Sequence, residues 1–346
     1  MTKRILTAGL ALSPVVIALH FGTSLGDTLL FVLAALALIP LAWLIGEATE
    51  HAAHHTGPGV GGFLNASFGN APELIIALLA VHGGLTDVVR GSLVGSVIGN
   101  LLLVLGFSLF FGGKGDLDRT SSLVSLLIVG LATVLFLIPA IPSWSGDPDR
   151  HSLAVLSLPV AIALFAIYIV VTWIALKRHR GLHTSDEPAE MAAWSLRTSL
   201  LVLGGATVVT ALVADVLVKT VETFAHKAHL SEFFVAIVII AIVGNAAEHG
   251  GAVVVAARGK IKLAAEIALS SSAQVAVFLI PAVAILSWAI EPLALSFRPV
   301  ELAALGAATV FTAATIHPGR SSKLRGALLV AAFVVAAVVF YFAGNR

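Results

Sequence analysis

Residues 69–73 read Gly-Asn-Ala-Pro-Glu, and residues 244–248 read Gly-Asn-Ala-Ala-Glu, so the chain carries nearly the same pentapeptide twice. Each copy lies inside a long apolar stretch and puts an amide and a carboxylate three residues apart, on one face of a helix. A carboxylate at membrane depth costs on the order of a few kcal/mol, so it is usually retained for an ion or a proton. Two such segments, one in each half, indicate a cation transporter with its site between two repeats.

The composition places the chain in a membrane. Of its 346 residues, 58% are hydrophobic and 11% are charged, whereas a soluble domain carries about 25% charged residues. A soluble globule is therefore excluded, and the lipid bilayer is an expected partner. The absence of cysteine excludes disulfides and zinc–thiolate sites. The net charge of +1 gives no indication of nucleic-acid binding.

Apolar runs of helical length follow one another along the whole chain. A transmembrane helix needs about 20 mostly apolar residues, and the runs are continuous rather than alternating, which excludes a barrel. The predicted fold class is an all-α polytopic membrane protein with about 11 transmembrane helices. The first span is predicted to be a retained helix, because no small-residue cleavage site follows it. The expected spans are 5–23, 28–52, 60–82, 86–111, 121–142, 152–176, 195–218, 231–257, 262–289, 297–316 and 324–343.

The distribution of basic residues predicts the orientation. Cytoplasmic loops of membrane proteins are enriched in lysine and arginine. With the N-terminus in the cytoplasm and an odd number of helices, the C-terminus lies outside. All but six of the 20 basic residues then fall on the cytoplasmic side. The six outside are Arg90, Arg150, Lys219, Lys227, Arg298 and Arg346.

The two motifs divide the chain into halves. They lie in the third and eighth spans, so spans two to six match spans seven to eleven. Five helices per repeat is an odd number, so the two copies enter the membrane in opposite senses, as in many secondary transporters. The predicted organisation is an extra N-terminal transmembrane helix (1–27), a first five-helix repeat (28–178), a cytoplasmic linker (179–194) and a second five-helix repeat (195–346).

Polar residues recur after each motif as well. Asn100 lies 30 positions after Asn70, and Gln274 lies 29 positions after Asn245. This recurrence favours a true repeat over chance similarity between apolar segments. Serines accompany both amides, at Ser92, Ser96, Ser270, Ser271 and Ser272.

The residue types in the motifs suit a hard cation. Calcium takes about six to eight oxygen ligands from carboxylates, amides, backbone carbonyls and water. Glu73 and Glu248 offer carboxylates, and Asn70 and Asn245 offer amide oxygens. With no cysteine and His249 as the one imidazole in either motif, a soft-metal site is disfavoured.

The first motif also predicts an interrupted helix. Pro72 lacks an N–H and clashes with the carbonyl one turn back, and Gly69 weakens the helix at the same place. Carbonyls released by the break become available as ligands when they line a cavity. The second copy has Ala247 in place of the proline, so a milder break is expected there.

The charge of the two carboxylates indicates exchange. Together Glu73 and Glu248 bring two negative charges, which one divalent cation or two protons would neutralise. Without a counter-charge the two carboxylates repel each other, so protons and cation compete for the same oxygens. A carrier that changes conformation only when its site is neutral is an antiporter, although its stoichiometry stays open.

The doubled motif resembles the paired repeats of the calcium/cation antiporter superfamily. The Asn-Ala-Pro-Glu form, with His249 after the second glutamate, resembles the calcium/proton exchanger branch. Sodium/calcium exchangers tend to carry serine or threonine where Asn70 and Asn245 stand, and often aspartate in the second copy. The similarity runs from about residue 28 to 343.

The resemblance implies a sodium/calcium exchanger-like fold of two inverted five-helix repeats plus an N-terminal helix. It implies that Glu73 and Glu248 bind the transported Ca²⁺ and also carry protons, with Asn70 and Asn245 assisting. No cofactor is implied. Less secure counterparts of the family's polar positions are Ser96, Asn100, Ser271 and Gln274. The acidic stretch that the family often has between its halves is here reduced to Asp186, Glu187 and Glu190.

Some polar residues have two interpretations. Glu47, Glu50 and His54 lie on one face near the end of the second span, as an acidic entry vestibule or a solvated helix end. His249 either tunes or relays protons, or is a hydrogen-bonded packing residue.

Several functions remain open beside Ca²⁺/H⁺ antiport. A sodium-driven calcium exchanger is one, and an exchanger of another divalent cation such as Mn²⁺ is another. A cation channel is less favoured, because channels usually build their selectivity rings from identical subunits. No nucleophile–base pair or metalloprotease spacing appears, so no enzyme is expected. The expected location is a prokaryotic cytoplasmic membrane, and a homo-oligomer is compatible with these features.

Overall fold

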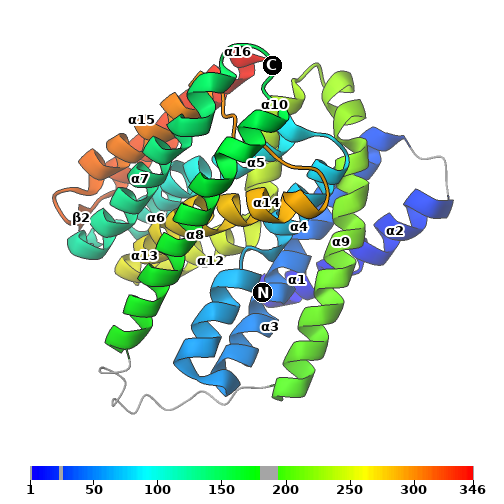
Figure 1. Ribbon diagram of the computed structural model, residues 1–346. Coiled ribbons are helices and arrows are strands. Elements are labelled where there is room, and N and C mark those ends of the chain that lie inside the picture. Colours follow the sequence, from blue (N-terminus) through cyan, green and yellow to red (C-terminus); the bar gives the residue numbers. More distant parts are fainter. Residues whose placement is uncertain (1, 23–25, 180–193, 346) are drawn as a thin grey trace.

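The computed structural model describes the backbone of residues 2–22, 26–179 and 194–345 (Figure 1). Side chains at 2–3, 57–63, 65–66, 175–179 and 247–249 are outside this description. The first half contains α1 (Thr2–Gly9), α2 (Leu12–Gly22), α3 (Asp27–Phe68), α4 (Ala71–His82), α5 (Thr86–Ile98), the π-helix η1 (Gly99–Val104), α6 (Leu105–Gly112), β1 (Gly115–Asp116), α7 (Arg119–Ser143) and α8 (His151–His179).

The second half repeats much of this order. It contains α9 (Leu196–Lys227), α10 (Glu232–Phe234), the π-helix η2 (Val235–Ile240), α11 (Ala241–Gly244), α12 (Ala246–Ala257), α13 (Ile261–Gln274), the π-helix η3 (Val275–Leu279), α14 (Ile280–Leu286), the 3₁₀ helix η4 (Ser287–Ala289), α15 (Pro299–Ile316), β2 (Arg320–Ser321) and α16 (Lys323–Ala343). The expected linker, 179–194, lies almost wholly outside the described residues.

The membrane-spanning helices agree with the all-α expectation, with a difference at the motifs. Within the described ranges, 9 helices are long and apolar enough to cross a bilayer. The spans expected at 60–82 and 231–257 are instead interrupted, which leaves the shorter apolar helices Ala71–His82 and Glu232–Gly244. The physical reason is the motif itself, because each copy ends one helix and begins another. The first expected span is also divided, into α1 and α2.

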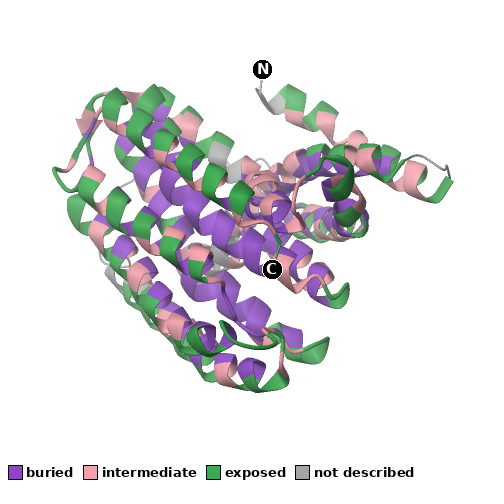
Figure 2. Ribbon diagram, turned by 90° about the horizontal axis from the view of Figure 1, so that it is seen from above, coloured by how far each residue is buried: buried purple, intermediate pink, exposed green. Residues whose placement is uncertain are grey.

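Two helices form the centre of the molecule. In the most apolar window of Thr86–Gly112, 83% of residues are buried, and in that of Ile261–Ala289 the share is 78%, against 50% or less in the other spans. Figure 2 shows this buried band running through the middle of the bundle, with exposed residues around it. Each of these two helices is the next long helix after one of the motifs in the sequence.

The outer helices carry the apolar surface that a bilayer requires. Leu127 on α7 is 71% exposed and Phe342 on α16 is 80% exposed, and such residues are stable there because lipid tails surround them. The long helices α3 and α9 pack against each other along much of their length (Figure 1).

Small residues bring α5 close to the second half. A Cβ at Gly95 would overlap the carbonyl of Ile237, and one at Gly91 would lie 3.2 Å from the Cβ of Ala236. The lack of a side chain at these two positions therefore allows η2 to lie directly on α5. Gly99 makes no such close approach, because a Cβ there would meet nothing within 4 Å.

A short antiparallel pair joins the two halves at one end of the bundle. Gly115 pairs with Ser321, and Asp116 pairs with Arg320. Lys262 at the start of α13 forms an ion pair with Asp118 nearby, at 3.1 Å. The basic-residue count put all these loops on one side of the membrane, and their contacts agree with that topology.

Candidate ion site

The first motif forms a sharp junction between two helices. α3 ends at Phe68 and α4 begins at Ala71, so Gly69 and Asn70 lie outside both helices. Asn70 has φ −97° and ψ 13°, and its carbonyl accepts the first α4 hydrogen bond, from the N–H of Leu74 at 3.0 Å. Pro72 occupies the first turn of α4, where its missing N–H has no helical partner to lose. The predicted break is confirmed.

The second motif forms a tighter junction. α11 ends at Gly244 and α12 begins at Ala246, so Asn245 alone lies between the helices, with φ −89° and ψ 2°. This break is milder than the first, as expected from Ala247. Glu73 and Glu248 therefore both stand three residues after the asparagine, in the first turn of a helix, where the helix dipole favours a carboxylate.

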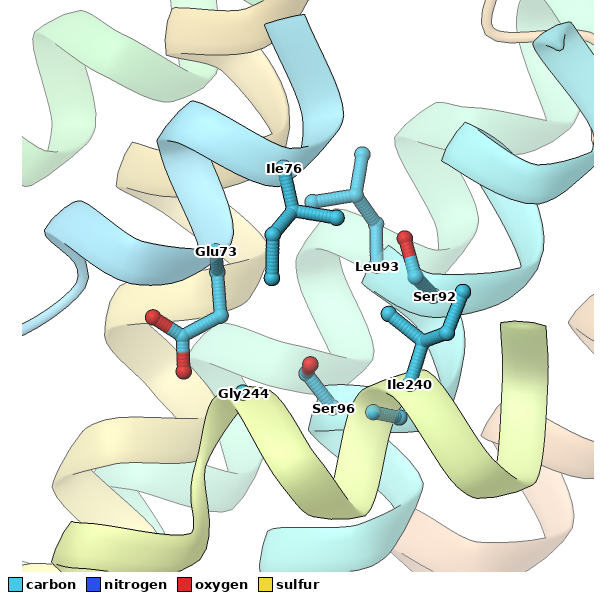
Figure 3. A pocket seen from close by; sticks show the side chains of 8 residues that line it. Glu73, Ile76, Ser92, Leu93, Ser96, Ile240 and Gly244 are labelled. Atoms are coloured by element: carbon cyan, nitrogen blue, oxygen red, sulfur yellow. The ribbon is translucent and has the colours of Figure 1, made fainter. Parts of the chain in front are cut away.

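Glu73 lies in a narrow pocket between the two halves. Its side chain is 8% exposed and extends from α4 toward Gly244 at the end of α11 (Figure 3). Ser96 of α5 reaches the same space. The cavity volume is about 10 Å³, which is close to the least space that holds one water molecule. The lining residues are Glu73, Ile76, Ser92, Leu93, Ser96, Ile240, Ala241 and Gly244.

Asn245 is fixed against the other half by its own amide. Its Nδ2 donates to Ser96 Oγ at 2.8 Å and to the carbonyl of Ala241 at 3.0 Å. Both N–H groups are thus used, so the assigned orientation leaves Oδ1 as the acceptor. This oxygen is buried and has no hydrogen-bond partner among the described side chains. An oriented, unsatisfied amide oxygen is what a cation ligand requires.

π-helical segments lie beside the other polar residues of the two halves. η1 begins at Gly99, next to Asn100, and η3 begins immediately after Gln274. Asn100 is 1% exposed and Ser271 is 7% exposed, whereas Gln274 is half-buried. π-Helical turns are rare and occur frequently at functional sites. None of these three residues is among those that line the Glu73 pocket.

Glu248 and His249 have a described backbone but no described side chain. Both lie in the first turn of α12, directly after Asn245. Their expected roles as ligand and proton carrier therefore fall outside what the structure describes. Among the side chains that it does describe, no group of three His, Cys, Asp or Glu residues lies close enough to hold a metal ion.

Glu47 and Glu50 lie apart from this pocket. Glu50 is exposed, and Glu47 lies 3.8 Å from His51 Nε2. The His51 ring lies 4.8 Å, between centroids, from Trp194 just before α9. The lining of the Glu73 pocket contains neither glutamate.

Gly244 has a role that the sequence analysis did not identify. A Cβ at this position would lie 3.2 Å from Cγ and 3.5 Å from Oε1 of Glu73. The absence of a side chain at Gly244 therefore allows the carboxylate to lie against α11. The sequence did mark this position, because both motifs begin with glycine.

The described part of the site is a set of hard oxygen donors in an otherwise apolar enclosure. The Glu73 carboxylate and the Ser96 hydroxyl line the pocket at the junction of α4, α5 and α11, and the amide nitrogen of Asn245 donates to the same serine. Such donors suit calcium or another hard cation. The site is also narrow, so a ligand of atomic size fits it and an organic substrate does not.

Known proteins resemble the chain over its whole length. The family described as sodium/calcium exchanger protein matches residues 26–177 and again 198–342. The Ca(2+)/H(+) antiporter ChaA of Bacillus subtilis is 36% identical over 352 residues, which cover 97% of this chain and 97% of that protein. The Ca(2+)/H(+) antiporter of Synechocystis sp. is 34% identical over 346 residues, which cover 92% of each protein.

A solved structure extends the resemblance to three dimensions. Native YfkE has a TM-score of 0.83 and 33% sequence identity, and the match covers 99% of this chain and 100% of that one. The arrangement of helices around the two motifs is therefore that of an experimentally determined protein.

Proposed function

This chain belongs to the sodium/calcium exchanger protein family, and from that premise we propose that it is a secondary transporter that exchanges Ca²⁺ for protons. The curated relatives that bear the name Ca(2+)/H(+) antiporter cover nearly the whole chain. The observation that carries the proposal is the buried Glu73 carboxylate, which shares an enclosure with Ser96 while Asn245 is held at its edge.

We propose that Ca²⁺ binds between the two motifs. Glu73 and Glu248 supply the carboxylates, and Asn70 and Asn245 supply amide oxygens. The unsatisfied Oδ1 of Asn245 supports this assignment, because burial of a polar atom without a partner is costly and a cation would remove that cost. Ser96, Asn100, Ser271 and Gln274 are proposed as lesser contributors from the central helices.

Protons are proposed to occupy the same carboxylates in turn. The two carboxylates are neutralised by one Ca²⁺ or by two protons, and a low-polarity enclosure such as that of Glu73 disfavours an uncompensated charge. The small cavity at Glu73 supports alternation, since it has space for about one water-sized occupant. His249, next to Glu248 in α12, is proposed to assist proton transfer.

The two halves are proposed to move as inverted repeats, 28–178 and 195–346, with residues 1–27 as the extra helix and 179–194 as the linker. The proposed location is the cytoplasmic membrane, with the N-terminus inside and the C-terminus outside. Contacts between loops assigned to the same side support this topology. Export of Ca²⁺ is the natural direction for such a carrier, and a homo-oligomer is compatible with it.

Sodium-driven exchange and transport of another divalent cation such as Mn²⁺ are the competing functions. The asparagines favour protons over sodium, because the resemblance places serine or threonine there in sodium-driven relatives. The inverted repeat argues against a channel.

The test is transport by purified protein in liposomes. Ca²⁺ uptake is followed with an internal indicator while a proton gradient or a sodium gradient is imposed separately. We expect uptake with the proton gradient, its loss when a protonophore collapses that gradient, and none in protein-free liposomes. Uptake driven by sodium and unaffected by the protonophore would refute the proposal, and competition by Mn²⁺ measures selectivity.

A further inference from the structure

Arg90 is a buried charge near the start of α5. Its side chain is 1% exposed. It forms ion pairs with Asp87 and Asp149, both at 2.7 Å. It also donates to Ser296 Oγ at 2.9 Å and to Thr86 Oγ1 at 3.0 Å.

These bonds join three parts of the chain at one end of the bundle. α5 supplies Arg90, the connection between α7 and α8 supplies Asp149, and the segment before α15 supplies Ser296. The first two belong to the first half and the third to the second half. The charge of Arg90 is neutralised by two aspartates rather than by water.

Glu301 is a second buried charge at this end, and it has no such compensation. It lies in the first turn of α15 and is 1% exposed. Its Oε2 accepts a hydrogen bond from the backbone N–H of Arg298 at 2.5 Å. Its Oε1 is buried and, within the ranges described, has no hydrogen-bond partner.

The hydrogen bonds described for the cations near Glu301 go to other groups. From α5, Arg90 and Asp87 act on Glu301 electrostatically, and Arg298 does so from the residue before α15. The Nη atoms of Arg90 bond to two aspartates, whereas its Nε is buried and has no hydrogen-bond partner among the described residues. The guanidinium of Arg298 donates to the carbonyls of Ala343 and Gly344, at 2.9 and 2.7 Å, and lies 4.4 Å from the centre of the Phe233 ring.

Charge balance then favours the neutral acid. Arg90 and Arg298 bring two positive charges, and Asp87 and Asp149 bring two negative charges. The group is neutral when Glu301 carries a proton and has an excess negative charge when it does not. A buried carboxylate oxygen without a partner is far more costly than a neutral carboxyl group.

We propose that Glu301 is a proton-binding site separate from the motif carboxylates, and that its proton stabilises the closed packing of α5, the α7–α8 connection and α15. Loss of the proton puts an uncompensated charge beneath Arg90, so the packing has to open enough to admit water. Protonation of Glu301 thereby makes the packing at this end of the bundle depend on pH, independently of ion binding at the motifs.

Infrared difference spectroscopy tests the protonation directly. Reconstituted wild-type protein and Glu301→Gln are compared in steps from acidic to alkaline pH. We expect one component of the carbonyl band of buried protonated carboxylic acids to disappear at alkaline pH in the wild type, and we expect that component alone to be absent in the variant at every pH. Glutamine imitates the neutral acid in shape and charge, so the variant should fold and retain Ca²⁺ uptake. A spectrum in which Glu301→Gln removes no such band would overturn the proposal.

Thiol accessibility tests the opening. The chain has no cysteine, so Ala294→Cys, at a residue 1% exposed, introduces a single thiol beside Arg90. The labelling rate of this thiol is measured in Ala294→Cys alone and in the double variant Ala294→Cys with Glu301→Gln. We expect the rate in the single variant, divided by the rate in the double variant, to rise with pH. A ratio that stays constant would show that Glu301 does not control the packing, whatever the outcome of the transport assay.

Discussion

The two copies of the motif reach similar geometry by different means. At the first copy the backbone determines the junction, with two residues outside helices and Pro72 at the start of α4. At the second copy a single residue lies outside helices, and its side chain holds it to Ser96 in the other half. The first junction therefore has a strong local determinant in Pro72, whereas the second is held in part by a bond to the other half. Two similar motifs in a repeat can therefore be stabilised by different interactions.

Removal of the charge at the first motif should have the largest effect. Glu73→Gln keeps the size of the side chain but removes both the carboxylate and the exchangeable proton. We expect initial Ca²⁺ uptake to fall at least about 100-fold, which corresponds to roughly 2.7 kcal/mol. The exposed Glu50→Gln is the matched control and should retain uptake. Substantial transport by Glu73→Gln would exclude a mechanism that needs both carboxylates.

Removal of the amide at the second motif should have the next largest effect. Asn245→Ala deletes both the oriented oxygen and the bond to Ser96, so we expect apparent Ca²⁺ affinity to fall about tenfold to 100-fold. Ser96→Ala removes the acceptor that orients the amide and one hydroxyl of the pocket but leaves the Asn245 oxygen in place, so its loss of affinity should be smaller. Affinity is measured from uptake against Ca²⁺ concentration. An Asn245→Ala protein with unchanged affinity would show that this amide is structural.

A methyl group at Gly244 tests the contact between the two motifs. Gly244→Ala would put a carbon 3.2 Å from Cγ of Glu73, and overpacking of this kind costs about 1–3 kcal/mol. We expect apparent Ca²⁺ affinity to fall roughly tenfold. Gly204→Ala on α9, where a Cβ meets nothing within 4 Å, is the control and should behave as wild type. Equal behaviour of the two variants would mean that Glu73 moves aside without consequence.

Exchange of the proline between the motifs should have the smallest effect. Pro72→Ala leaves an acceptable first-turn residue, and Ala247→Pro introduces proline in the first turn of α12, where it is tolerated. Each change should alter unfolding free energy by about 1 kcal/mol or less, with uptake preserved. Thermal unfolding of the purified variants measures this. A large destabilisation by Ala247→Pro alone would show that the second junction needs its helical N–H groups.

The sequence predicted the family, the all-helical fold and the first break correctly. Gly69 and Pro72 are strong local signals, and the doubled motif is specific. The three π-helical segments were not predictable, because their sequences are ordinary apolar runs and the extra residue per turn is set by packing. The bond from Asn245 to Ser96 joins residues 149 positions apart, which no local pattern reveals.

Buried charges were the other limit of sequence reasoning. The count of basic residues assigned Arg90 to one side of the membrane but gave no sign that it is buried. Its burial depends on Asp149 and Ser296, which come from distant segments. The sequence likewise gave no sign that Glu301, at the start of a helix, is buried. Only the packing of α15 against its neighbours makes it a buried group.

The pairing of β1 with β2 means that the halves are connected by more than the peptide chain between them. Because strand hydrogen bonds join residues 115–116 to 320–321, and α5 lies directly on η2 through Gly95, a cut within 179–194 would leave both contacts intact. Two separately translated fragments, 1–178 and 195–346, therefore possess the surfaces needed to find each other in the bilayer.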